Sequence, residues 1–314
     1  MIEGAILPAI HARLDAALAA PSIRYRPLIV DGIALGWLDD ARAARLARFD
    51  TVFRVDNARI VFAATLRNCE ERSASLIGVT NTLRAKGEFP AWRDELYAAS
   101  STFGAPPAFR IERGAARWFG IRTWAVHVNG VVGEGNASEL WFARRSPDKG
   151  VDPGRLDNLV GGGITAGARV DETLRKEAWE EAGIPADVAR RATAAGAVHV
   201  RRALADGLER ETIFVHDLAL SRHFVPANQD GEAIEHRRVD LYEAARLIAI
   251  ETGPDEVTVD ASLVVLDFLL RTGAIAADAH HYLALEALRY LGADVYPHAC
   301  GFAATLFPRP PKGK

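Results

Sequence analysis

The sequence contains few cysteines and no long hydrophobic run. Only two of its 314 residues are cysteines, Cys69 and Cys300, and their separation is not that of a metal-binding motif. Two distant cysteines argue against a disulfide framework and favour a reducing compartment, so we expect a cytoplasmic protein. No segment approaches the roughly 20 apolar residues that a membrane-spanning helix needs, and residues 1–20 lack the layout of a signal peptide. We therefore expect no membrane partner.

The chain also lacks a strong excess of charge of either sign. Its formal net charge is −3, whereas a protein that binds nucleic acid mainly through phosphate contacts carries an excess of basic residues. We therefore expect no nucleic acid partner. Apolar residues make up 49% of the chain, which is ordinary for a globular protein with a substantial core.

Turn signals and changes in hydrophobic pattern divide the chain into three parts. Residues 1–116 predict a small α+β domain, which begins with a helix, contains a hairpin at Asp31-Gly32 and ends near the Gly-Ala-Pro-Pro sequence at 104–107. Within it, residues 91–100 are typical of a helix. Residues 117–272 predict a larger domain, and residues 273–314 a helical extension and tail.

The larger domain begins with strands and contains a glycine-rich segment. Residues 122–133 and 139–146 alternate in the manner of strands, and a short apolar strand runs into three consecutive glycines, Gly161 to Gly163. A hairpin is expected at Asp206-Gly207, followed by a polar loop over residues 225–240.

The helix after the glycines carries more acidic residues than an isolated helix tolerates. At about 100° per residue, Glu177, Glu180 and Glu181 share one face, with Cβ atoms about 5–6 Å apart. Like charges at this spacing destabilise a helix, and a divalent cation removes the repulsion. Solvation of the whole acidic face is the simpler alternative. The adjoining strand, triple glycine and Gly183-Ile184 end favour a metal site.

The three glycines complete this interpretation. Without a Cβ atom, the backbone at Gly161, Gly162 and Gly163 can approach a ligand closely and offer oxygens to a metal or amides to a phosphate. A metal between this loop and the acidic helix would bridge the protein and a pyrophosphate. That arrangement predicts metal-assisted hydrolysis of a phosphate anhydride.

The segment from Gly162 to Ile184 resembles the signature of the Nudix hydrolases, G-x5-E-x7-R-E-U-x-E-E-x-G-U, where U is apolar. The matching positions are Gly162, Glu177, Ala178, Glu180, Glu181, Gly183 and Ile184. Two positions differ, because Ala168 stands where the pattern has glutamate and Lys176 where it has arginine. Lys176 can still reach Glu180 at i+4, without the bidentate fork of an arginine.

The resemblance implies a fold, a cofactor and a set of ligands. The fold would be an α/β/α sandwich with a mixed sheet, preceded by the small α+β domain. Glu177, Glu180 and Glu181 would bind Mg²⁺ or Mn²⁺, with the Gly161 carbonyl as a further ligand. Glu232 would be an additional ligand or general base, with Glu235 as the second candidate. A homodimer is one possible assembly.

Other residues beside the glycines are candidates for substrate binding. Arg144 and Arg145 end a predicted strand, where they would contact a diphosphate or simply face solvent. Asp157 and Asn158 precede the glycines, where they would contact substrate or cap the turn. The aromatic residues near the first strands, Trp118, Phe119, Trp124, Trp141 and Phe142, fit an aromatic ligand, but core packing is the more common role.

A narrower resemblance covers most of residues 5–272. The sequences "LDNLVGGG" and "ETLRKEAWEEAGIP" are similar to the Nudix region of fungal thiamine pyrophosphokinase and its stand-alone plant and bacterial relatives. The implied reaction is hydrolysis of thiamine diphosphate, or of its oxidised analogues, to the monophosphate and phosphate. ADP-ribose or a nucleotide sugar is the alternative substrate. A catalytically silent ligand-binding protein and an isopentenyl diphosphate isomerase, which would need a cysteine in the Nudix region, are alternatives of other classes.

Overall fold

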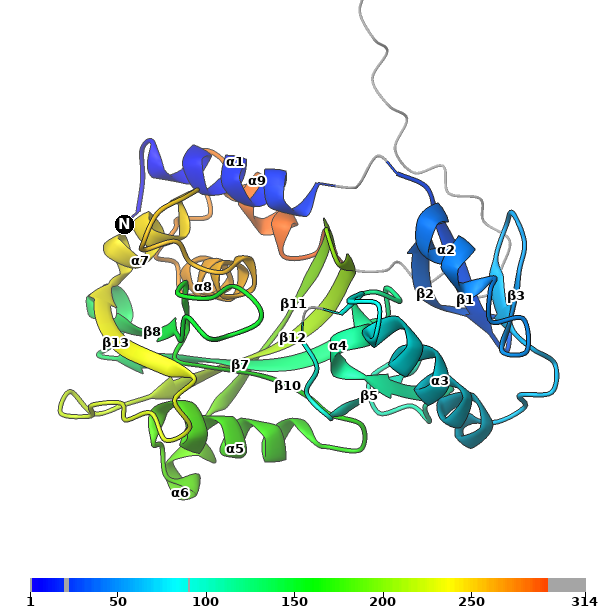
Figure 1. Ribbon diagram of the computed structural model, residues 1–314. Helices are drawn as coiled ribbons and strands as arrows, with labels where there is room; N and C mark the ends of the chain where they lie inside the picture. The colour runs from blue at the N-terminus through cyan, green and yellow to red at the C-terminus, as the bar shows by residue number, and fades with distance from the viewer. Residues whose placement is uncertain (1, 20–22, 90, 293–314) are drawn as a thin grey trace, which may run out of the picture.

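The computed structural model describes residues 2–19, 23–89 and 91–292. Cys300 and the predicted tail lie outside this part of the chain. Figure 1 shows a large twisted sheet between two layers of helices, with a smaller unit at one end. None of the helices in the described ranges combines the length and apolar character needed to cross a bilayer.

A mixed sheet forms the centre of the larger unit. Five strands follow the order β11-β12-β7-β8-β13, while β10 pairs with β7 and β9 pairs with β8. The β7 and β12 strands run parallel, and the other pairs are antiparallel. The strands are β7 (Thr123–Val132), β8 (Glu139–Arg145), β9 (Leu156–Asn158), β10 (Val160–Gly163), β11 (Thr193–Leu204), β12 (Gly207–Ala219) and β13 (Ala233–Asp240).

Helices cover both faces of this sheet. On one face, α5 (Val170–Ala182) packs on β7 and β10 through a core that includes Leu174 and Ala178, and α6 (Ala186–Ala189) packs against α5. On the other face, α7 (Leu241–Ile248) and α8 (Val259–Arg271) bury an apolar cluster against it. The predicted α/β/α sandwich with a mixed sheet is therefore confirmed (Figure 1).

The smaller unit has its own hydrophobic core, which is the expected α+β arrangement. Its four-stranded sheet has the order β2-β1-β4-β3, and β5 and β6 form a separate hairpin. A short 3-10 helix, Gly135–Ala137, follows β7 in the larger unit. The elements of the smaller unit are β1 (Tyr25–Val30), β2 (Ile33–Asp39), α2 (Asp40–Leu46), β3 (Phe53–Val55), β4 (Ile60–Phe62), α3 (Cys69–Arg84), β5 (Leu96–Ala99), β6 (Phe109–Glu112) and α4 (Arg113–Ala116).

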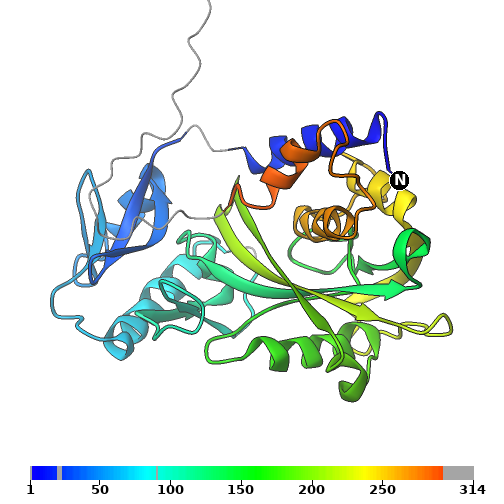
Figure 2. The ribbon, with the colours of Figure 1, turned by 180° about the vertical axis from the view of Figure 1, so that it is seen from behind.

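The first and last described helices belong to the core of the larger unit. Residues of α1 (Ile6–Leu18), among them Leu7, Ile10 and Leu14, are buried in the cluster that contains α7 and α8. Leu285 and Leu288 of α9 (Tyr282–Leu288) join the same cluster. Figures 1 and 2 both place α1 beside α9, away from the β1–β4 sheet. Packing therefore cuts across the expected boundaries at residues 116 and 272.

Two local predictions were wrong. Residues 91–100 do not form a helix, because Leu96–Ala99 is the strand β5, in which Tyr97 and Ala99 are buried and pair with β6. The polar loop predicted over residues 225–240 includes β13, whose residues Ala233–Asp240 pair with β8. In both cases an available partner strand overrides the local sequence preference.

Candidate active site

The acidic helix α5 begins and ends at the positions that its sequence indicates. The Glu172 carboxylate accepts a hydrogen bond from the Arg169 N–H at 3.1 Å, which satisfies a free donor at the start of the helix. At the other end Gly183 has φ +64°, a conformation that favours glycine, and Ile184 is fully buried behind it. These contacts fix the ends of α5, and its core-facing side packs on β10.

The three signature glutamates lie on one side of α5 but differ in environment. Lys176 Nζ donates to Glu180 at 2.7 Å and to Glu177 at 3.1 Å, so the predicted i+4 contact is present. The Glu181 carboxylate is buried and accepts a hydrogen bond from the Gly161 N–H at 2.8 Å. No three acidic, histidine or cysteine side chains converge as a metal site among the described residues.

The glycines of β10 are needed because side chains crowd them from two directions. A Cβ atom added at Gly162 would lie 2.3 Å from Glu177 Cγ, and one added at Gly163 would lie 1.8 Å from the Tyr97 hydroxyl. Real Cβ atoms do not approach other atoms this closely. The glycines therefore let α5 and the β5–β6 hairpin both reach the same segment of backbone.

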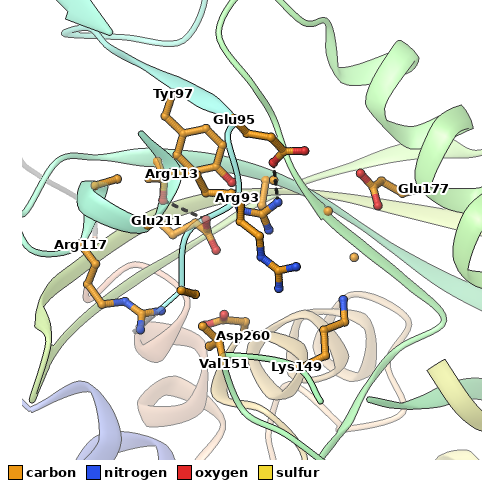
Figure 3. Close-up of a pocket in the computed structure, with 18 of the residues that line it drawn as sticks. Arg93, Glu95, Tyr97, Arg113, Arg117, Lys149, Val151, Glu177, Glu211 and Asp260 are labelled. Carbon is orange, nitrogen blue, oxygen red and sulfur yellow. Dashed lines mark hydrogen bonds and ion pairs between the residues drawn. The ribbon is translucent and has the colours of Figure 1, made fainter. Parts of the chain in front are cut away.

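These elements surround a cavity of about 360 Å³, a volume typical of small-molecule sites. Figure 3 shows that both units contribute side chains to it. Its wall includes residues of the smaller unit (Arg93, Glu95, Tyr97, Arg113), residues of the sheet (Thr123, His127, Gly161, Gly162, Gly163, Glu209, Glu211), residues of α5 (Lys176, Glu177, Glu180), and Arg117, Arg145, Lys149, Asp157, Glu232 and Asp260.

Basic side chains reach into the cavity opposite the acidic helix. Lys149 forms an ion pair with Glu232 and lies 4.0 Å from Glu181, while Arg93 lies 3.8 Å from Glu232. Arg113 donates to Glu95 at 2.8 Å and stacks over the Tyr97 ring. In Figure 3, Arg93 and Lys149 extend toward the same space as Glu177. A diphosphate in this space would therefore meet several positive charges.

Burial changes the acid strength of the groups at this end of the cavity. Burial raises the pKa of Glu181 to about 8, although the nearby Lys149 and the Gly161 N–H act in the opposite direction. Burial also raises the pKa of Glu177 and lowers the pKa of Lys149. The charged forms of these groups are therefore disfavoured until an ion or ligand compensates for the lost solvent.

The structure brings some of the predicted site residues together and excludes others. Gly161, Gly162, Gly163, Glu177, Glu180 and Glu232 line the cavity. Arg144 does not, because it forms ion pairs with Glu235 and Asp255 away from the cavity. The prediction that Arg144 contacts substrate therefore does not fit this structure.

The neighbouring residue has the position that was expected for Arg144. Successive strand residues point to opposite faces, so Arg145 turns toward the cavity and donates to Asp157 at 2.7 Å. Asn158 is buried behind the wall and hydrogen-bonds His127 at 2.8 Å. Asn158 therefore supports a wall residue, and its predicted contact with substrate does not fit.

Sequence reasoning missed the basic residues of the smaller unit. Arg93 and Arg113 come from segments with no recognisable motif. A helix over residues 91–100, as predicted, would have given the Arg93 side chain a different direction. The sequence Leu96–Ala99 has no polar and apolar alternation that would indicate a strand, and the alternation appears only in the burial of Tyr97 and Ala99. The aromatic residues Trp118, Phe119 and Phe142 are core residues, and Cys69 lies in α3, outside the cavity.

Comparison with known families agrees with this geometry. The NUDIX domain model matches residues 122–260, and a domain of unknown function (DUF4743) matches residues 14–123. The chain belongs to the Nudix hydrolases, enzymes that cleave pyrophosphate-type linkages in small molecules.

Named relatives extend over most of the chain. The chain is 35% identical over 263 residues to Nudix hydrolase 24, chloroplastic, of Arabidopsis thaliana. This alignment covers 83% of this chain and 71% of that protein. The chain is 34% identical over 271 residues to Nudix hydrolase 20, chloroplastic, of the same plant, with the same coverage. A crystal structure of a MutT protein from Methanosarcina mazei Go1 aligns with 49% of this chain and 94% of its own, at 20% identity and a TM-score of 0.36.

Proposed function

We propose that this Nudix hydrolase cleaves the diphosphate of thiamine diphosphate, or of its oxidised analogues, to the monophosphate and phosphate. The observation that carries the proposal is the common cavity of the signature acids Glu177 and Glu180 and the basic residues Arg93, Arg113 and Lys149. Glu181 lies buried behind this wall, against Gly161. The narrower sequence resemblance supports the thiamine group. The acidic residues Glu211 and Asp260 in the cavity wall support a substrate with a polar organic part.

The donor types at the α5 end suit a divalent cation. The carboxylates of Glu177, Glu180 and Glu181 are hard oxygen donors of the kind that Mg²⁺ and Mn²⁺ prefer. Glycine at position 162 leaves the Glu177 side chain the space that a Cβ atom would fill. We assign these three residues, with the Gly161 carbonyl, to hold the ion. Bound there, it would polarise a phosphoryl oxygen and lower the pKa of a bound water.

The chain's own basic residues would orient the diphosphate. Lys149, Arg93 and Arg113 face the acidic helix across the cavity, so the two phosphates would lie between cationic side chains and the glycine backbone. Charge-assisted hydrogen bonds of this kind both bind and position phosphate oxygens. Water would attack one phosphorus, and the bridging P–O bond would break to leave phosphate and the monophosphate.

Glu232 is the residue that we propose as the base for the attacking water. It lies in the cavity wall, where Lys149 and Arg93 hold its carboxylate. Glu235, the second candidate, is on β13 and pairs with Arg144 outside the cavity. A carboxylate fixed by two cations has a defined position from which to accept a proton.

The alternatives predict different substrate profiles. An ADP-ribose or nucleotide-sugar diphosphatase would use the same acids and basic residues with another organic group. A catalytically silent protein would bind a diphosphate without releasing phosphate. The isomerase alternative needs a cysteine in the cavity, and the wall contains none among the described residues.

Phosphate release from a substrate panel tests the proposal. The panel contains the diphosphates of thiamine and oxythiamine, ADP-ribose and a nucleotide sugar, each with and without Mg²⁺. We expect the highest kcat/KM for a thiamine-type diphosphate and loss of activity in Glu180→Gln and Glu181→Gln. Preference for ADP-ribose would overturn the thiamine assignment, and full Mg²⁺-dependent activity in both variants would overturn the assigned acids.

Two further expectations from the sequence remain proposals. We propose a homodimer and a cytoplasmic location. Sedimentation analysis of the full chain and microscopy of the tagged protein in its own cells would test them.

A further inference from the structure

The cavity has a second end, which the signature acids do not reach. Figure 3 shows Glu211 and Asp260 on the side away from Glu177, with Arg93 and Lys149 between them. Glu211 comes from β12 and Asp260 from the first turn of α8, so neither belongs to the Nudix signature. Both line the same cavity as the phosphate-binding side chains.

Most charges at this inner end are already paired. Arg117 binds Asp206 at 3.1 Å and Glu209 at 2.6 Å. Arg202 also pairs with Glu209 and lies 3.6 Å from Asp152. The guanidinium groups of Arg117 and Arg202 are therefore committed to other carboxylates.

Glu211 and Asp260 have no ion-pair partner among the described residues. Glu211 accepts one hydrogen bond, from the Thr123 hydroxyl at 2.9 Å, and forms no ion pair within 4 Å inside the described ranges. The Oδ1 atom of Asp260 is buried and has no hydrogen-bond partner in the same part of the chain. A buried carboxylate oxygen without a donor is energetically costly, so its presence in a cavity wall points to a ligand that supplies one.

The mutual electrostatics of the acids agree with this. Burial, followed by the charge of Glu209, raises the pKa of both Glu211 and Asp260, while Arg202 partly opposes the shift at Asp260. A group that is positively charged, or that carries amino hydrogens, would relieve both the repulsion and the missing hydrogen bond. An anionic group would make both worse.

We propose that Glu211 and Asp260 form a specificity subsite for the cationic or amino-bearing heteroaromatic part of the substrate, whose diphosphate lies at the α5 end. This inference deepens the proposed function and rests on it for the orientation of the substrate. The division of charge within one cavity, basic residues at the phosphates and free acids beyond them, selects a substrate that is itself bipolar. Diphosphates with a neutral alkyl or an anionic organic group lack the matching charge.

Binding of free thiamine tests the subsite separately from hydrolysis, because free thiamine has the cationic heteroaromatic part and no phosphate. Calorimetry would compare the wild type with Asp260→Asn and Glu211→Gln, which keep the shape of each side chain and remove its charge. Asp187→Asn, on the exposed surface of α6, is the matched control. Thermal melting verifies that each variant is folded.

We expect Asp260→Asn and Glu211→Gln to weaken thiamine binding at least tenfold, and the control Asp187→Asn to bind as the wild type does. Wild-type affinity in both subsite variants, or no thiamine binding by the wild type, would overturn the subsite. The result of the hydrolysis panel is independent of this binding test. If thiamine diphosphate is not cleaved but free thiamine binding depends on Glu211 and Asp260, the subsite stands and the proposed reaction is wrong.

Discussion

The Gly161 N–H donates a 2.8 Å hydrogen bond to the Glu181 carboxylate, and this contact joins the glycine strand to the acidic helix. It holds a buried acid against a segment of backbone that lines the cavity. Burial raises the pKa of this acid to about 8, so the contact stabilises a group that is costly to ionise without a neighbouring cation.

The first prediction is a pH-dependent stability of the metal-free protein. The pKa of Glu181 is raised to about 8 from an ordinary value near 4.3, so the folded state holds a proton that the unfolded state loses first. The stabilising effect of that proton is fully present below pH about 4 and is lost as pH rises through about 8. In metal-free buffer, the wild-type Tm should therefore fall relative to Glu181→Gln between these values.

Addition of Mg²⁺ should reverse this trend above pH 7, because a bound cation favours the ionised carboxylate. Thermal melts of both proteins across the pH range, with and without Mg²⁺, provide the measurement. A Tm difference that stays constant with pH would contradict the raised pKa.

The second prediction concerns substrate binding by Lys149. Lys149→Met removes a cation that faces the phosphates and pairs with Glu232. Because a hydrogen bond to a charged group contributes about 1.5–3 kcal/mol, kcat/KM should fall roughly ten- to a hundredfold. Steady-state phosphate release measures the effect, and Lys86→Met, at an exposed position after α3, is the control. Equal activities of the two variants would exclude Lys149 from the site.

The third prediction compares two adjacent arginines. Arg145→Ala should lower kcat/KM, since Arg145 lines the cavity and orients Asp157 at 2.7 Å. Arg144→Ala should keep kcat/KM within about twofold of the wild-type value. It should lower Tm instead, because it breaks the ion pairs with Glu235 and Asp255, and the pair with Asp255 is partly shielded from solvent. Kinetics and melting of both variants decide the point. A larger decrease in kcat/KM for Arg144→Ala than for Arg145→Ala would mean that Arg144, and not Arg145, points toward the cavity.

The fourth prediction concerns the space at Gly162. Gly162→Ala places a Cβ atom 2.3 Å from Glu177 Cγ, so either α5 or the glutamate must move. We expect overpacking to cost about 1–3 kcal/mol of stability and the displacement of Glu177 to reduce activity. Gly78→Ala is the control, because nothing lies within 4 Å of that helical position and the change should stabilise α3 by about 0.5–1 kcal/mol. Chemical denaturation and phosphate release measure both variants.

Local sequence predicted the features of the site that depend on short-range chemistry. The end of α5 at Gly183, the hairpin at Asp206-Gly207 and the alignment of Glu177 with Glu180 all follow from neighbouring residues. Each needs only a backbone conformation, a turn or a helical repeat. The resemblance to the Nudix signature predicted the α/β/α sandwich, and the structure has this fold.

The strands at the unit boundary could not be predicted in the same way. The segment around Tyr97 has the composition of a helix, but its pairing with β6 makes it a strand and directs Tyr97 toward Gly163. Strand formation depends on a partner that lies elsewhere in the chain, so local preference is a weak guide.

The sequence by itself determined the acidic helix, the glycine strand beside it and the class of chemistry that they support, because these follow from residues close together in the chain. Only the tertiary structure decided which distant charges meet them. It turned Arg145 toward the cavity and Arg144 away, since strand register sets the facing of every side chain. It also brought Glu211 and Asp260 to the inner end, because packing of α8 on the sheet joins segments that no local pattern connects.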